Sequence, residues 1–217
     1  MSLGVAIVAG GRGTRLRGLA GGPPKALAPL AGGTLLSHQL AAVAPLQPRR
    51  TVVLLHHAAA EIAAALPPGV EPLVEPAPLG TAGGLGLLPT GPERWLIVNV
   101  DHVSTFDRAA LLVGWAPPGV AALAEREVPV DDGVVRLFRG RIVGWDERPT
   151  LRLPVTTGLY VLCAEALRAA LPDPAPLDMP ALILRLGGVE GRLLPGRWLD
   201  AGTPERLAAA RALVPER

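Results

Sequence analysis

The chain has 217 residues, a length that suits one α/β domain. Its formal net charge of +2, with no basic helix and no basic patch interleaved with aromatics, argues against nucleic-acid binding. Hydrophobic residues make up 49% of the chain but aromatics only 3%, so Leu, Val and Ala must fill the core.

Cysteine usage and hydropathy predict the compartment. The single cysteine, Cys163, excludes an intrachain disulfide and is expected to be a buried, inert thiol. No apolar stretch approaches about 18 residues without a breaker, and the first residues have no charged segment typical of a signal peptide. We therefore predict a soluble, cytoplasmic protein with no membrane partner.

A loop rich in glycine and arginine follows the first predicted strand, residues 3–8. Gly10, Gly11 and Gly13 can each adopt a positive φ and leave the backbone bare, so that N–H groups can converge on phosphate oxygens. Cationic side chains surround the same place. An ordinary surface loop is the alternative, but this loop begins where open α/β sheets bind ligands. The candidate phosphate-binding residues are Ala9, Gly10, Gly11, Arg12, Gly13, Thr14, Arg15, Arg17 and Lys25.

Apolar runs and helical periodicity alternate through the rest of the first half. The strand 51–55 is a continuous apolar run of the kind found in a doubly covered parallel sheet. The alternation predicts a Rossmann-like α/β fold, a mixed and mainly parallel sheet with helices on both faces. The predicted helices are 34–44, 58–66 and 82–88, and the predicted strands are 51–55, 70–74 and 95–100.

The second half has a looser pattern. Asp131-Asp132-Gly133 and Arg139-Gly140 are turn signals between short alternating runs, which predicts antiparallel strands. We expect one domain, 1–217, with a nucleotide-binding half of about 1–115 and a sugar-phosphate-binding half of about 116–217. The predicted strands are 120–127, 134–139, 141–145 and 155–163, and the predicted helices are 107–115, 165–171, 177–186 and 203–213.

The loop resembles the signature of the sugar-1-phosphate nucleotidyltransferases, L-A-G-G-x-G-T-R-L followed by P-K. Here the pattern reads V-A-G-G-R-G-T-R-L over residues 8–16, then Pro24-Lys25. No Walker G-K-[ST] is present, and Leu16 replaces the third glycine of a dinucleotide fingerprint. The resemblance, in particular to mannose-1-phosphate and heptose-1-phosphate guanylyltransferases, implies the fold of the nucleotide-diphospho-sugar transferases.

Residues 75–84, E-P-A-P-L-G-T-A-G-G, resemble the E-x-x-P-L-G-T-A-G segment that reads the base in that family. Gly80 would let the base approach the backbone, and Thr81 would cap the following helix. Glu75 would contact the base edge, and a carboxylate suits the two donors of guanine. This favours GTP over UTP. Outside this resemblance, the segment would be interpreted as a Pro-rich turn and a helix cap.

Two further motifs each supply a carboxylate. Asn99-Val100-Asp101 resembles the family's N-G-D, and W-L-D-A-G-T-P-E over residues 198–205 resembles W-x-D-I-G-T-P-E. The resemblance implies that Asp101 and Asp200 hold one Mg²⁺ beside the α-phosphate. For a lone Asp at a strand end, a helix cap would be the commoner role.

The expected acceptor side comes from two weaker matches together with Asn99. Glu147-Arg148-Pro149 lies where the family has E-K-P, with Arg in place of Lys, and Thr157-Gly158 lies within a match to N-x-G-I-Y. The residues expected to bind the sugar phosphate are Asn99, Glu147, Arg148, Thr157 and Gly158.

The resemblance implies an enzyme of the EC 2.7.7 type, a monomer or homodimer, with Arg15, Lys25 and Asp101 as catalytic residues. It would join an NTP, with GTP favoured, to a mannose- or heptose-type sugar 1-phosphate and release pyrophosphate. Two alternatives stay open: uridylyl transfer to another sugar 1-phosphate, and a non-catalytic regulator that binds nucleotide sugars.

Overall fold

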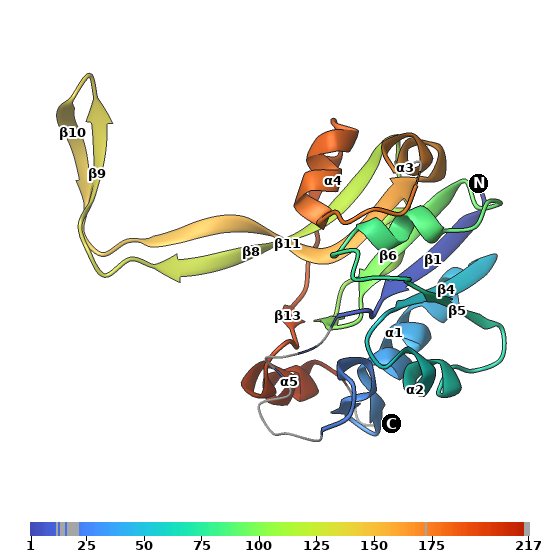
Figure 1. The fold of residues 1–217 in the computed structure, drawn as a ribbon. Coiled ribbons are helices and arrows are strands. Elements are labelled where there is room, and N and C mark those ends of the chain that lie inside the picture. The colour runs from blue at the N-terminus through green and yellow to red at the C-terminus, as the bar shows by residue number, and fades with distance from the viewer. Residues whose placement is uncertain (12, 14–15, 17–21, 172, 215–217) are drawn as a thin grey trace.

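The computed structural model describes residues 1–11, 13, 16, 22–171 and 173–214. Its centre is a seven-stranded sheet in the order β12-β8-β11-β6-β1-β4-β5 (Figure 1). Four of these strands are parallel neighbours, and β11 alone runs antiparallel to both its neighbours, β6 and β8. The strands are β1 (Leu3–Val8), β4 (Arg50–Leu55), β5 (Val70–Val74), β6 (Arg94–Asn99), β8 (Gly119–Pro129), β11 (Thr150–Cys163) and β12 (Glu190–Leu193).

Helices cover both faces of the sheet, because successive strand residues point to opposite sides. In β1, Val5 and Ile7 pack with α1, α2 and α5, whereas Ala6 packs with α3 and α4. The predicted Rossmann-like, mainly parallel fold is therefore confirmed. Within the described residues, no helix is long and apolar enough to cross a membrane. The helices are α1 (Leu35–Val43), α2 (Ala59–Ala64), α3 (Ala164–Ala170), α4 (Met179–Leu186) and α5 (Pro204–Ala210).

Two predicted helices are wrong, because each forms only a short 3₁₀ segment. Segment 82–88 contains η3 (Gly83–Leu87), whose glycines favour helix poorly and allow a close approach: a Cβ on Gly83 would lie 1.9 Å from the Ala175 carbonyl oxygen. Segment 107–115 contains η4 (Arg108–Leu111), capped by Asp107. The other 3₁₀ segments are η1 (Lys25–Leu27), η2 (Ala44–Leu46) and η5 (Arg211–Leu213).

Several very short strands were not predicted from the sequence. Runs of two or three residues give no detectable periodicity. One such pair, β7 with β13, is important below because it joins the middle of the chain to its C-terminal part. These strands are β2 (Pro29–Leu30), β3 (Gly33–Thr34), β7 (His102–Ser104) and β13 (Trp198–Asp200).

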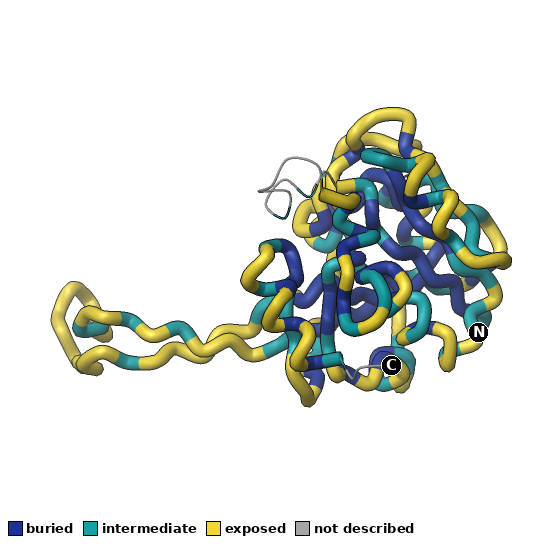
Figure 2. Tube along the Cα trace, turned by 90° about the horizontal axis from the view of Figure 1, so that it is seen from below, coloured by how far each residue is buried: buried dark blue, intermediate teal, exposed yellow. Residues whose placement is uncertain are grey.

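Strands β8 and β11 are longer than predicted and leave the sheet as a two-stranded arm (Figure 1). The arm pairs residues 123–129 with 150–156, and a second hairpin at its far end consists of β9 (Val134–Phe138) and β10 (Arg141–Asp146). Exposed residues predominate along this whole projection (Figure 2). We call residues 147–149, between hairpin and arm, the elbow.

Candidate functional site

The carboxyl ends of the four parallel strands meet at one edge of the sheet. Val8 pairs with both Leu54 and Asn99, and Leu55 pairs with Val74, so the loops that follow these strands open side by side. The order of the strands reverses at β1, and such a switch point is where open α/β sheets bind ligands. A cavity of about 500 Å³ lies there, lined by Val8, Ala9, Gly10, Gly11, Lys25, His56, Glu75, Pro78, Leu79, Gly80, Thr81, Asn99, Val100, Asp101 and Asp200.

The glycine-rich loop closes on Lys25. Gly13 has φ +59°, and a Cβ there would lie 2.9 Å from the Lys25 Cβ. Among the described glycines of this loop, Gly13 alone adopts the positive φ that is open to all three. Gly10 instead permits close approach, since a Cβ there would lie 3.3 Å from the His56 nitrogen. Arg12, Thr14, Arg15 and Arg17 lie outside the described residues.

An ion pair joins Lys25 to Asp101 inside the cavity. The two side chains are 18% and 16% exposed, so the pair is largely shielded from solvent. Lys25 begins η1, and Asp101 follows β6, so the sheet edge brings together residues that are 76 positions apart. A partly buried ammonium and carboxylate at a strand end can exchange partners with a bound phosphate or cation.

The short β7–β13 ladder brings the second carboxylate to the same place. Asp200 pairs with His102 in this ladder, and the Ala201 N–H donates to the Asp101 carbonyl at 2.9 Å. A Cβ on Gly202 would lie 2.7 Å from Asp200 Oδ1 and 3.6 Å from Asp101 Oδ2, so the two carboxylates flank one backbone position.

The two carboxylates fit a magnesium ion. Asp200 Oδ1 accepts from the Gly202 N–H at 2.8 Å, and its Oδ2 lies 3.3 Å from Arg206 Nη1, so each carboxylate is now balanced by a cation. In the described part of the chain, no group of three or more His, Cys, Asp or Glu could hold a metal. Mg²⁺ commonly takes only one or two carboxylates, with phosphate oxygens and water completing its shell.

A buried polar cluster behind Asp101 was not predicted from the sequence. The Gln39 amide donates to the carbonyls of Val100, at 3.3 Å, and His102, so it holds the backbone on both sides of Asp101. Its oxygen accepts from Arg108 at 2.6 Å. The available signal was a glutamine on the apolar face of the predicted helix 34–44.

His102 supports the same turn from the other side. Its Nδ1 lies 2.7 Å from the Thr157 carbonyl, which can only accept, so Nδ1 carries the proton and Nε2 accepts from the Ser104 hydroxyl at 2.7 Å. Burial, and then the charge of Arg108, lower the pKa of His102 to about 3, so the ring is neutral at physiological pH.

The predicted base-reading segment lines the other end of the cavity. Glu75 is 5% exposed, and burial raises its pKa. One of its oxygens accepts from the Leu79 N–H at 3.4 Å, and a Cβ on Gly84 would lie 2.4 Å from the other. One carboxylate oxygen thus accepts a hydrogen bond from the turn that follows Glu75, and the other oxygen lies beside Gly84.

Thr81 caps a different helix from the one predicted. Its hydroxyl oxygen accepts from the Met179 N–H at 2.7 Å, at the start of α4, whereas η3 has no side-chain cap. Gly80 has φ +78°, and a Cβ there would lie 2.7 Å from the Leu177 carbonyl oxygen. Both residues therefore fasten this loop to the segment before α4, which explains their residue types without any ligand.

Of the expected acceptor residues, the structure brings together Asn99 and Gly158. Gly158 has φ +82°, and a Cβ there would lie 2.6 Å from Asn99 Nδ2. The Thr157 side chain is directed elsewhere: its hydroxyl donates to the Ala122 carbonyl at 3.0 Å and the residue is 3% exposed, so the expected hydroxyl contact to sugar is corrected. Val100 is 4% exposed and packs in the core.

Glu147 and Arg148 lie on the elbow, away from the cavity. Glu147 accepts from the Trp145 indole at 2.9 Å, and the neighbouring Pro149 carbonyl accepts from the Val130 N–H at 3.0 Å. The seven residue pairs of the arm span about 20 Å at about 3.3 Å per residue. The structure thus places Glu147 and Arg148 on the elbow, and their expected contact with the sugar phosphate stays a prediction.

We expect Gly158→Ala to lower the free energy of unfolding by about 2–4 kcal/mol and to displace Asn99, because the new Cβ combines a left-handed φ with a collision. Chemical denaturation measures the loss. The control is Gly69→Ala, which has φ +85° but meets no described atom within 4 Å and should cost only the backbone share, about 1–2 kcal/mol. Equal losses for the two variants would contradict the proposed contact with Asn99.

The doubly wound sheet, the glycine-rich loop at its switch point and the facing carboxylates define a nucleotide-binding protein of the nucleotidyltransferase class. The chain belongs to the family described as the MobA-like NTP transferase domain, whose model matches residues 5–144.

Named relatives agree with this assignment. A mannose-1-phosphate guanylyltransferase catalytic subunit beta from Dictyostelium discoideum is 26% identical over 231 residues, which cover 95% of this chain and 63% of that protein. The bifunctional protein GlmU of Rubrobacter xylanophilus is 32% identical over 181 residues, which cover 76% of this chain and 38% of that protein. The chain thus spans less than two thirds of the length of these relatives. The resemblance to sugar-1-phosphate nucleotidyltransferases is confirmed.

Solved structures share the fold. A Bacillus anthracis protein assigned as a glucose-1-phosphate thymidylyltransferase superposes with a TM-score of 0.77 at 20% identity, covering 98% of this chain and 95% of that one. HddC from Yersinia pseudotuberculosis, complexed with GMP-PN, superposes with a TM-score of 0.68 at 19% identity, covering 96% of this chain and 98% of that one.

Proposed function

We propose that this protein transfers a nucleotidyl group from an NTP to a sugar 1-phosphate. The observation that carries the proposal is the Lys25–Asp101 ion pair flanked by Asp200 at the switch point of the sheet. Relatives named as mannose-1-phosphate guanylyltransferase support this substrate class. Residues of about 1–115 would hold the nucleotide, and those of about 116–217 would receive the sugar phosphate.

The reaction would be a single in-line displacement. A phosphate oxygen of the acceptor forms a bond to the α-phosphorus of the NTP, the bond from that phosphorus to the bridging oxygen breaks, and pyrophosphate leaves. No covalent enzyme intermediate is needed, so the protein contributes positioning and electrostatics. Arg15 and the N–H groups of residues 9–14 would hold the β- and γ-phosphates.

Lys25 and the two carboxylates would act at the α-phosphate. The Lys25 ammonium, held beside Asp101, is free to donate to an α-phosphate oxygen once a second cation occupies the carboxylates. Asp101 and Asp200 would hold Mg²⁺, which when bound neutralises charge between the phosphates. Gln39 and His102 would keep the Asp101 backbone in place for both tasks.

The acceptor would lie beyond the α-phosphate, next to Asn99 and Gly158. Asn99 is the last residue of β6, two residues before Asp101, and its amide lies against Gly158, so it can offer hydrogen bonds to sugar hydroxyls.

Glu75 would read the base and so favour GTP. We expect Glu75→Gln to lower kcat/KM for GTP by about 10- to 100-fold, the worth of a charged hydrogen bond, and to affect UTP less. It should also raise the free energy of unfolding at pH 7. The sign follows from the raised pKa: the folded state holds the proton more tightly, so ionisation costs stability as pH rises past that pKa.

The control for Glu75→Gln is Glu71→Gln. Glu71 lies on the same strand-loop segment, but its side chain is 46% exposed and paired with Arg50 at 2.8 Å. This variant should leave the ratio of GTP to UTP turnover unchanged. An equal fall for both nucleotides in Glu75→Gln would remove Glu75 from base selection.

One screen tests the function. Pyrophosphate release should be measured for four NTPs against a panel of sugar 1-phosphates, and we expect the highest kcat/KM for GTP with a mannose- or heptose-type acceptor. Dominance of UTP would support the uridylyltransferase alternative. Silence with every pair, together with tight binding of a nucleotide sugar, would support a non-catalytic regulator and refute the proposal.

A further inference from the structure

The arm has one charged face and one apolar face. Residues directly opposite in an antiparallel pair share a face, so Arg152 lies with Glu127 and Glu125, to which it is bridged at 3.2 and 3.8 Å. The other face is formed mainly by apolar residues, of which Leu151 and Leu153 are 38% and 45% exposed. The residues of this apolar face are Ala124, Val128, Leu151, Leu153 and Val155, with Arg126 among them.

The hairpin at the end of the arm is also two-faced. Its register places Leu137 opposite Ile142 and Val135 opposite Trp145, all on one face, with exposures of 64%, 59%, 37% and 60% respectively. The other face carries the bridge between Arg136 and Asp146 at 2.7 Å. Contiguous large apolar side chains in solvent mark an interaction surface, since isolated proteins seldom expose them together.

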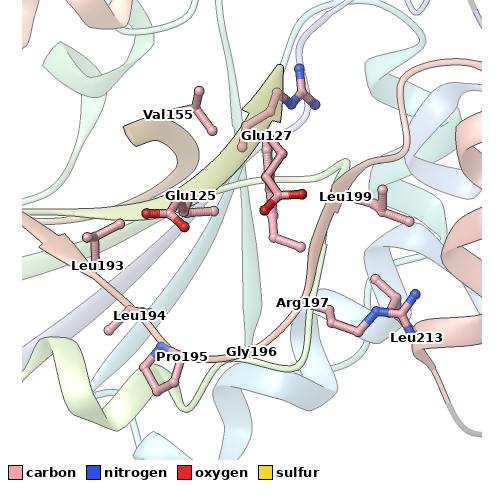
Figure 3. A pocket seen from close by; sticks show the side chains of 13 residues that line it. Glu125, Glu127, Val155, Leu193, Leu194, Pro195, Gly196, Arg197, Leu199 and Leu213 are labelled. Carbon is pink, nitrogen blue, oxygen red and sulfur yellow. The ribbon is translucent and has the colours of Figure 1, made fainter. Parts of the chain in front are cut away.

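A cavity of about 760 Å³ lies where the arm leaves the body (Figure 3). We call it the root cavity. Two residues of the arm's apolar face, Ala124 and Val155, line it, so this face, on which Arg126 is the one charged residue, extends into the cavity. Leu193, Leu194, Pro195 and Leu213 supply further apolar lining, and the carboxylates of Glu125 and Glu127 lie at its upper side (Figure 3).

The root cavity adjoins the candidate active site. Trp198 and Leu199 of β13 line the root cavity, and the next residue of the same strand, Asp200, lines the active-site cavity. The Arg126 guanidinium lies over the Trp198 ring, with its Cζ 6.0 Å from the ring centroid. Leu151 and Leu153 therefore form the middle of the arm's apolar face. An occupant of the root cavity would therefore lie one residue along β13 from Asp200.

We propose that a second copy of this chain covers the arm and that each elbow completes the partner's acceptor site. Two arms related by a two-fold axis at the middle of the arm lie antiparallel, apolar face to apolar face, and the axis places each elbow over the other copy's root cavity. There Glu147 and Arg148 meet the acceptor side of the partner's site. This placement rests on the proposed function, since Arg148 would bind the sugar phosphate.

Two features favour a second copy over another occupant. The apolar surface runs from root to elbow, so two identical arms match in length without any further segment. The root cavity offers the carboxylates of Glu125 and Glu127 to an incoming Arg148.

Mass in solution tests the pairing without any turnover. Sedimentation should give twice the 22.4 kDa of one chain for the wild type, and a monomer for the double variant Leu151→Glu/Leu153→Glu with an unchanged circular dichroism spectrum. Leu184→Glu, at an 82% exposed position on α4, is the control and should stay dimeric. A monomeric wild type, or a double variant that stays dimeric, would overturn the proposal.

A cross-link tests the position of the elbow. In a Cys163→Ala background, Glu147→Cys together with Leu199→Cys should give a covalent dimer with a short bismaleimide, because elbow and root cavity meet only between copies. Glu147→Cys alone should give at least about tenfold less covalent dimer, because the two elbows lie at opposite ends of the paired arms, about 20 Å apart. A dimer in solution that yields no covalent product from the double-cysteine chain would refute the elbow placement.

Mixing inactive variants tests the role of the elbow. Lys25→Ala and Arg148→Ala chains should each be impaired, and an equilibrated mixture should recover about a quarter of the wild-type rate, because half the dimers are mixed and each holds one intact site. No recovery would refute a site shared between copies. A wild type that transfers nothing would overturn the proposed function, whereas mass and cross-linking would still decide the pairing.

Discussion

Asp101→Asn should lower kcat for pyrophosphate release by about 10³-fold, because it removes one of the two carboxylates that would hold the metal and each 1.4 kcal/mol of lost stabilisation is about tenfold in rate. Asparagine keeps the shape of the side chain but has no negative charge to pair with Lys25 or to bind a cation. The Mg²⁺ concentration that gives half-maximal rate should rise in parallel. Steady-state kinetics over a magnesium titration measures both effects.

The matched control is Asp107→Asn, the same substitution six residues further along the chain. Asp107 accepts from the Ala109 N–H at 2.9 Å as the cap of η4, a role that asparagine fills equally well. We expect kcat and magnesium dependence to stay within about twofold of wild type. A wild-type rate for Asp101→Asn at the same magnesium concentration would refute the assignment of the metal-binding carboxylates.

The sequence was most informative where function depends on the ends of strands. Val8 and Asn99 end strands whose central residues are continuous apolar runs, so the sequence pattern alone placed their following loops at one edge of the sheet. Asp200 was different, because β13 is three residues long and has no signature of its own. Its meeting with Asp101 was expected only from the family motif, and the β7–β13 ladder explains how it occurs.

Side-chain partners were predicted less well than strand ends, because they depend on tertiary contacts. Thr81 was expected to cap the helix next in sequence, yet it caps α4, nearly a hundred residues away. Thr157 has a hydroxyl suited to a sugar, but the bulge in β11 turns it to the Ala122 carbonyl. Residue type and spacing do not distinguish such alternatives.

The arm shows a further limit of periodicity. Leu151, Leu153 and Val155 alternate as in a half-buried strand, and this pattern indicates that one face is to be covered but not which molecule covers it. The predicted strand began at 155, and Glu147 and Arg148 were expected to bind the sugar phosphate. Seven paired residues of arm carry the elbow away from the body, a distance that the sequence pattern did not indicate.

Lys25→Ala should lower kcat by about 10²–10³-fold, the effect of losing one preorganised cationic donor at a developing charge. Lys25→Arg should recover part of that loss, because the charge returns, but not all of it, since a planar guanidinium does not match an ammonium paired with Asp101 on a stem packed against Gly13. Pre-steady-state kinetics separates the chemical step from nucleotide binding, which calorimetry measures alone.

The chain offers an independent test of the same residue, because Lys25 is its single lysine. Reductive methylation therefore modifies Lys25 and the N-terminal amine and no other side chain. Methylation keeps the charge but removes N–H donors, so the rate should fall in the wild type and not fall further in Lys25→Arg, whose remaining target is the exposed N-terminus. Equal losses in the two proteins would assign the effect to the N-terminus and remove Lys25 from the reaction.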